Sequence, residues 1–210
     1  NSIFKSIETT GHEKSAIVIL QGLMKLRQIA NHPVMAYEEY KSGSGKFETV
    51  LQDMESVISE GHKILVFSSF VKHLALYSAE LTRKRIRFAM LTGASTNRER
   101  IVSNFQNDPE NRIFLISLKA GGVGLNLTAA DYVFILDPWW NPASEMQAMS
   151  RAHRIGQDKN VFMYKYITTN SIEEKITRLQ EKKSKLADTF ISSNNPLKDI
   201  DIKQILDIIG

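Results

Sequence analysis

Short apolar runs alternate along this chain with longer segments in which apolar residues recur every three or four positions. The runs are rich in β-branched and aromatic residues and have turn-forming residues beside them, which favours buried strands. Runs that are apolar throughout are typical of a parallel sheet covered on both faces. The pattern predicts strands at 63–69, 88–92, 112–117, 131–136 and 161–168.

Helical periodicity fills the segments between these strands. It predicts helices at 15–31, 47–60, 70–83, 96–107 and 171–191. Two of them begin with a capping box, Thr96 with Glu99 and Ser171 with Glu174, in which each side chain would accept a free backbone N–H. The alternation of strands and helices predicts an α/β fold, a parallel sheet with helices on both faces and further helices flanking it.

The helix after the fourth strand is predicted from its end signals. Asn141 is a favourable N-cap, Pro142 suits the first helical position, where its missing N–H costs nothing, and Gly156 is a typical stop. At about 100° per residue, Gln147, Arg151 and Arg154 then fall within roughly 60° on one face. Parallel guanidinium groups suit the oxygens of a polyphosphate, although a solvated helix face is the alternative for any pair of surface arginines.

A second candidate site is the glycine-rich loop SLKAGGVGLNL, which begins at Ser117, directly after the third strand. Gly122 and Gly124 would let the backbone approach a ligand closely, while Ser117, Lys119 and Asn126 can donate hydrogen bonds. The alternative is a structural turn. By contrast, KSGSGK at 41–46 lacks the spacing and the preceding strand of a phosphate-binding P-loop and is expected to be a turn before a helix.

Composition narrows the function classes. The 210 residues include no cysteine, which excludes disulfides and cysteine-ligated metal sites and fits an intracellular protein. No run approaches the ~18 apolar residues of a membrane span, and no signal-peptide pattern is present. The net charge of +4 permits nucleic-acid binding without demonstrating it. Because an initiating Met is missing, we expect a piece of a longer protein.

The strings SLKAGGVGLNL, DPWWNP and QAMSRAHRIGQ, in this order, resemble motifs V, Va and VI of the Swi/Snf-type ATPases of helicase superfamily two. KILVFSS resembles motif IV, and LMKLRQIANHPVM resembles the segment leading into the second lobe of that family. The resemblance implies the second, C-terminal RecA-like lobe of a DNA-stimulated ATPase. It divides the chain into a lead-in and packing helix (1–45), a RecA-like helicase C-terminal lobe (46–168) and a bracing helix and tail (169–210).

The resemblance also implies roles for individual residues. Arg151 and Arg154 would act on ATP as arginine fingers, which are worth about 10³ to 10⁵ in rate elsewhere. Trp140 would couple the ATP state to DNA, and Lys119 departs from the arginine that the family often carries there. The remaining implied contacts are with ATP, by Gln147, Gly122, Gly124 and Asn126, and with the DNA backbone, by Ser68, Ser69, Arg98, Ser117 and Lys119. For Ser68 and Ser69 the alternative is capping of the next helix.

The chain lacks two parts of the motor, a P-loop lysine and a D-E-x-[HD] carboxylate pair. Mg²⁺ would therefore be held by a separate N-terminal RecA-like lobe, and this chain alone should not hydrolyse ATP. The expected partners are that lobe, double-stranded DNA and a DNA-bound protein, with no membrane. The expected location is the cytoplasm or nucleoid if bacterial and the nucleus if eukaryotic. Two alternatives stay open: a nucleic-acid-binding or protein-interaction module without ATPase activity, and half of an RNA helicase.

Overall fold

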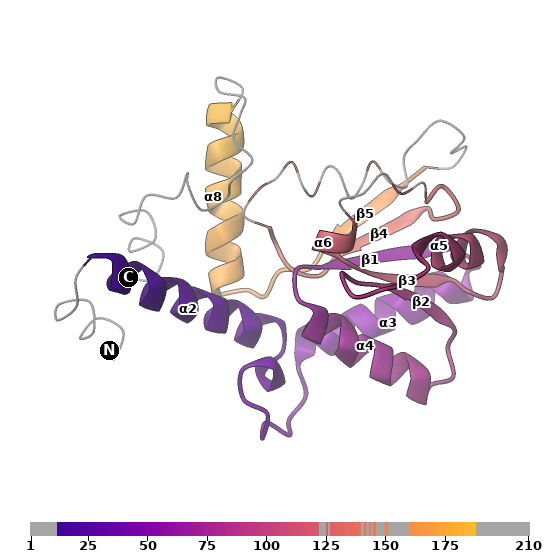
Figure 1. Ribbon diagram of the computed structural model, residues 1–210, viewed down its shortest axis with the longest axis horizontal. Helices are drawn as coiled ribbons and strands as arrows, with labels where there is room; N and C mark the ends of the chain where they lie inside the picture. Colours follow the sequence, from indigo (N-terminus) through magenta and orange to yellow (C-terminus); the bar gives the residue numbers. More distant parts are fainter. Residues whose placement is uncertain are drawn as a thin grey trace. The chain divides into compact units, whose positions relative to one another are not determined.

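The fold is seen in a computed structural model of the chain (Figure 1), which describes residues 12–121, 125, 127–139, 141, 143, 145, 150 and 160–187. Two compact units divide the chain. One comprises Gly43–Ile167, and the other combines Asn1–Ser42 with Thr168–Gly210. The sheet lies in the first of these, which we call the sheet unit, and the second is called the helical unit.

Five parallel strands build the sheet, in the order β2-β3-β1-β4-β5. Their bounds are Ile64–Ser68 (β1), Phe88–Leu91 (β2), Ile113–Ser117 (β3), Tyr132–Ile135 (β4) and Phe162–Lys165 (β5). All five predicted strands and their parallel pairing are confirmed. The central strands β1 and β3 are buried at every position, as expected of apolar runs with helices on both faces.

Helices cover the sheet on both sides. They are α3 (Gly45–Ser59), α4 (Val71–Arg83), α5 (Arg98–Asn107) and the one-turn α6 (Leu118–Gly121). Alternate residues of β1 enter different cores: Ile64 and Val66 pack with α3 and α4, while Leu65 and Phe67 pack with α5 and α6. The prediction of an α/β sheet with helices on both faces is therefore confirmed.

Two details of the helix starts differ from the prediction. The N-cap of α5 is Asn97, not Thr96, and no side chain caps it, so the capping box with Glu99 is wrong. Asn97 has a φ of 53°, a left-handed conformation that Asn tolerates. The turn before it contains a bond of 2.9 Å from the Thr92 N–H to the Ser95 hydroxyl. The other difference is that α3 begins at Gly45, which places Lys46 in its first turn rather than before the helix.

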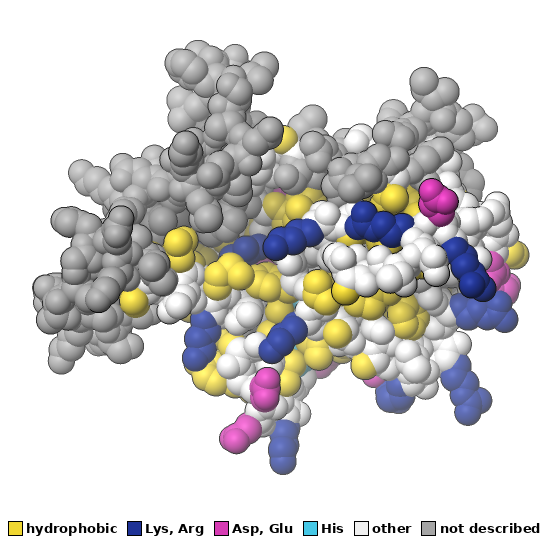
Figure 2. All heavy atoms as spheres, in the orientation of Figure 1, with side chains coloured by type: hydrophobic (Ala, Val, Ile, Leu, Met, Phe, Trp, Pro, Cys, Tyr) yellow, Lys and Arg dark blue, Asp and Glu magenta, His cyan; other side chains and the backbone are white. Residues whose placement is uncertain are grey.

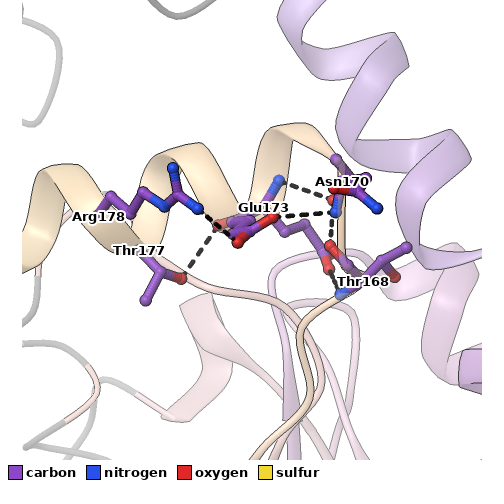
Figure 3. Close-up of polar contacts among 7 residues, drawn as sticks. Thr168, Asn170, Glu173, Thr177 and Arg178 are labelled. Carbon is purple, nitrogen blue, oxygen red and sulfur yellow. Dashed lines mark hydrogen bonds and ion pairs between the residues drawn. The ribbon is translucent and has the colours of Figure 1, made fainter.

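The helical unit contains α2 (His12–Asn31), the short 3₁₀ helix η1 (Pro33–Met35) and α8 (Ile172–Ala187). The start of α8 is shown in Figure 3, where the predicted capping box forms with partners displaced by one residue. Ser171 Oγ accepts the Glu173 N–H at 3.1 Å, and Glu174 accepts that of Asn170 at 3.0 Å. The buried Glu173 carboxylate adds a bond from the Thr168 N–H at 2.9 Å. The part of the predicted helix and tail beyond Ala187 lies outside the described residues.

Candidate functional site

The carboxyl ends of β1 and β3 lie side by side in the sheet unit, since Ser68 and Ser117 are register partners. In Figure 1, α6 and the start of α4 lie at this end of the sheet. The edges at the carboxyl ends of parallel strands are where α/β folds bind ligands. Three residues predicted to contact DNA, Ser68, Ser69 and Ser117, are therefore gathered at one place.

The end of β1 is held by a carboxylate that the sequence reasoning did not single out. Asp137 is fully buried and accepts the Ser68 hydroxyl at 2.6 Å and the Ser69 N–H at 3.1 Å. The Ser68 oxygen in turn accepts the Phe70 N–H at 3.0 Å, just before α4 begins. The N-cap of α4 is Phe70, and no side chain caps the helix, so the Ser68 hydroxyl holds the residue before the helix rather than capping it. The Ser69 side chain is half-buried.

The Ser117 hydroxyl is in the opposite situation. Its side chain is 3% exposed, and in the described part of the chain its oxygen has no hydrogen-bond partner. A buried hydroxyl without a partner costs about 1–3 kcal/mol, and such groups often mark a site that another molecule or a conformational change completes. The most distinctive polar feature of this edge is therefore that the Ser68 hydroxyl is hydrogen-bonded, whereas the hydroxyl of its register partner Ser117 has no partner among the described residues.

Cations border the same edge. Lys119 lies in α6, two residues after Ser117, and its side chain is exposed. Arg98, at the start of α5, donates a hydrogen bond of 3.5 Å to the Ala120 carbonyl. Figure 2 shows Lys and Arg side chains spread over the surface of α4, α5 and α6, with acidic side chains toward its margins. This distribution suits a polyanion, which the net charge by itself did not establish.

Asn141 caps the helix that was predicted after β4. Its side-chain oxygen accepts the Ala143 N–H at 3.0 Å, and Ala143, Glu145 and Ser150 are helical. Gln147, Arg151 and Arg154, which the sequence predicts on this helix, lie outside the described residues. The same holds for Gly122, Gly124, Asn126 and Trp140.

Glu145 fixes the start of this helix, and the sequence reasoning missed it. The carboxylate is almost buried and accepts both the Trp139 N–H at 3.0 Å and the Lys165 ammonium at 2.8 Å. Trp139 itself is 4% exposed and meets Phe67 edge-on, with ring centroids 6.2 Å apart, so it belongs to the core. A signal existed for Asp137, which follows the apolar strand β4 by two residues at the edge where ligands bind.

No group of three His, Asp or Glu side chains that could hold a metal ion occurs among the described residues. The helices within the described ranges include none that is long and apolar enough to cross a membrane.

Comparison with known protein families shows to which family the domain that contains this edge belongs. The family described as helicase conserved C-terminal domain matches residues 45–156, more than half of the chain. The chain belongs to this family. The match starts with α3 and ends in the predicted arginine helix, so this helicase C-terminal domain includes the whole carboxyl edge except β5.

Individual relatives and solved structures show which type of helicase domain this chain resembles. An ATP-dependent helicase of Schizosaccharomyces pombe is 47% identical over 152 residues, which are 70% of this chain and 15% of the relative. The SWI2/SNF2 ATPase C-terminal domain of Sulfolobus solfataricus is 30% identical with a TM-score of 0.77, covering 99% of this chain and 87% of that one. The core of the SWI2/SNF2 ATPase from the same organism, solved with double-stranded DNA, has a TM-score of 0.79, 30% identity and coverage of 99% and 45%.

These likenesses identify the chain as a C-terminal RecA-like domain of the Swi/Snf type, as its motifs predicted. The chain spans only 11 to 22% of the length of these curated relatives.

Proposed function

We propose that this chain is the second motor lobe of a DNA-stimulated ATPase that translocates on double-stranded DNA and remodels protein–DNA complexes. The observation that carries the proposal is the register of Ser68 with Ser117 beside the exposed Lys119, on a domain of the Swi/Snf type. In the Sulfolobus relative the corresponding fold is part of an ATPase core solved with double-stranded DNA, which supports the same partner here.

DNA would be held through its backbone. Lys119 and Arg98 supply charge, while Ser69 and Ser117 supply hydroxyl groups to phosphate oxygens. Ser68 would act indirectly, because its hydroxyl already bonds Asp137 and the Phe70 N–H. Such contacts carry little base readout, and binding should weaken steeply as salt is added.

ATP would lie between this lobe and an N-terminal RecA-like lobe that holds Mg²⁺. On this side Arg151 and Arg154 would neutralise charge as the phosphoryl group transfers, and Gln147 would assist them. The loop residues Gly122, Gly124 and Asn126 would approach the nucleotide. Trp140 would couple the ATP state to DNA. This assignment follows the motifs, and the bonds of Asn141 and Glu145 support it by fixing where the arginine helix starts. The chain without its partner lobe should not turn over ATP.

The same proposal covers the organisation and setting of the protein. Residues 46–168 would be the RecA-like lobe, with 1–45 as its lead-in and 169–210 as a bracing helix and tail. The setting would be intracellular, at the DNA of the nucleoid or nucleus, with a DNA-bound protein as the object that is displaced or moved.

The test is ATP turnover by the uninterrupted parent chain, with and without duplex DNA, for the wild type and for Arg154→Ala. We expect DNA to stimulate the wild type and the substitution to remove most of the stimulated rate while ATP still binds. The control is Arg178→Ala, since that arginine is exposed and its guanidinium pairs with Glu174 on α8. If Arg154→Ala retains the wild-type rate, the arginine helix has no catalytic role.

Two further outcomes would replace the proposal rather than adjust it. DNA binding by the parent without any ATP turnover would favour an interaction module that kept the fold and lost the motor. Efficient separation of RNA strands would favour an RNA helicase, because the Swi/Snf resemblance predicts translocation without general unwinding.

A further inference from the structure

The outer strand of the sheet carries large apolar side chains in the open. In β5, Phe162 is 48% exposed, and Met163 and Tyr164 are 45% exposed. Within the described residues β5 pairs only with β4, so it is a sheet edge. Natural proteins usually protect such edges with charges, proline or covering segments, because an open edge is a template for another strand. The apolar residues here point to a surface that another chain covers.

Three aromatic rings line one face of this edge. Tyr132 on β4 stands opposite Phe162 with ring centroids 5.2 Å apart, and it stacks on Tyr164 at 6.0 Å with an interplanar angle of 16°. The His62 ring lies next to the Tyr132 ring, with centroids 5.0 Å apart. Its Nδ1 forms a hydrogen bond of 2.6 Å with the Asp131 carboxylate. Adjacent aromatic faces are binding surfaces for apolar groups and for cations.

Acidic side chains accompany the aromatic row. Asp53 and Glu60 are seven positions apart on α3 and at its end, which places them on the same side of the helix. Asp53 accepts the Tyr166 hydroxyl at 2.9 Å. Desolvation raises the pKa of Tyr132, and Tyr164 and the Glu60 carboxylate raise it further. Neither acid has a cationic partner among the described residues. One negative line therefore runs beside the open aromatic strand, from Tyr166 to Tyr132.

We propose that β5 and the acidic side of α3 bind an extended, lysine- or arginine-bearing segment of a partner protein, which pairs with β5 as a sixth strand. The open edge supplies backbone hydrogen bonds, the rings supply apolar and cation–π contacts, and the two acids select the charge. A second copy of this chain fits poorly, because its own β5 would bring a second acidic line to the first. This surface is separate from the carboxyl edge and does not rest on the function proposed above.

The direct test is fluorescence anisotropy of a labelled peptide of alternating lysine and valine, titrated with the chain without nucleotide or DNA. We expect saturable binding and none to the glutamate–valine counterpart. Removal of one ring contact by Tyr164→Ala should weaken binding about fivefold, the worth of one cation–π contact. Glu60→Gln should weaken it by a similar factor and also reduce its dependence on salt. N-methylation of alternate peptide nitrogens should abolish binding, since strand pairing needs their N–H groups.

Matched controls keep the interpretation specific. Val71→Ala removes a similarly exposed apolar residue on α4, and Glu110→Gln removes an exposed acid from a turn; both should bind as the wild type does. Equal binding of the acidic peptide, equal losses in the controls, or no binding at all would overturn the proposal. Concentration-dependent dimers that Tyr164→Ala disrupts would assign the edge to a second copy instead. If the chain binds the peptide but the longer parent protein does not, a segment of the parent itself occupies the β5 edge. This result would also overturn the proposal.

Discussion

Replacing Asp137 by alanine is the sharpest test of how the carboxyl edge is built. The carboxylate is fully buried, and it accepts the Ser68 hydroxyl at 2.6 Å and the Ser69 N–H at 3.1 Å. A hydrogen bond to a charged group contributes about 1.5–3 kcal/mol, and the Ser68 hydroxyl and the Ser69 N–H would both lose this acceptor. Asp137→Ala should therefore lower the free energy of unfolding by about 3–5 kcal/mol. That loss is a large part of the ~5–15 kcal/mol that stabilises a typical domain.

Urea denaturation followed by circular dichroism would measure this loss. Asp137→Asn is the matched control, since an amide oxygen can still accept the Ser68 hydroxyl at nearly the same place; we expect a loss of about 1–2 kcal/mol. The double variant with Ser68→Ala should lose less than the sum of its single variants, because both act on one bond. A loss below about 1 kcal/mol for Asp137→Ala would refute the view that this carboxylate organises the edge.

Two further predictions use side chains with opposite hydrogen-bonding states. Ser117→Ala should not lower the free energy of unfolding and should raise it by up to about 1 kcal/mol, because it removes a buried hydroxyl that has no partner among the described residues. Ser68→Ala should instead lower it by about 1–2 kcal/mol, because the bond to Asp137 is lost; equal losses in urea denaturation would contradict this. Burial and the bond to Asp53 hold the pKa of Tyr166 far above its ordinary 10.0. The stability that this raised pKa contributes is complete below pH 10.0 and falls at higher pH as the unfolded phenol ionises. Tyr166→Phe should thus cost about 1 kcal/mol near neutral pH and flatten the alkaline fall; parallel stability curves for the two proteins would count against it.

The strands could be predicted from the sequence because a strand buried on both faces is apolar at nearly every position. The run from Ile64 to Phe67 is apolar at every position, and only a sheet covered on both faces uses such a run fully. The start of α5 could not be predicted in the same way. Thr96 and Glu99 match a capping box, but the backbone reaches the helix through a left-handed Asn97. That conformation depends on how the turn after β2 meets the sheet, which local spacing does not contain.

The candidate site shows a similar division. Ser68 and Ser117 could be predicted to lie together, because parallel strands bring their carboxyl ends to one edge. Asp137 could not be assigned its role from the sequence, since its partners are nearly seventy residues away in the chain. Glu145 likewise stands in an ordinary helix start, and only the fold brings Lys165 to it from β5. Long-range pairing of this kind is set by strand order, which the sequence does not state.

The two buried acids make the carboxyl edge one connected structure. Asp137 ties the end of β1 to the chain leaving β4, and Glu145 ties that same chain to β5 through Lys165. Between the two acids lies the segment that leads into the arginine helix, beginning at its N-cap Asn141. A displacement at Ser69 would therefore be passed to the start of that helix through buried, charge-assisted bonds rather than through a flexible loop. If the lobe binds DNA and ATP as proposed above, these bonds would supply the stiffness that coupling between the two ligands requires.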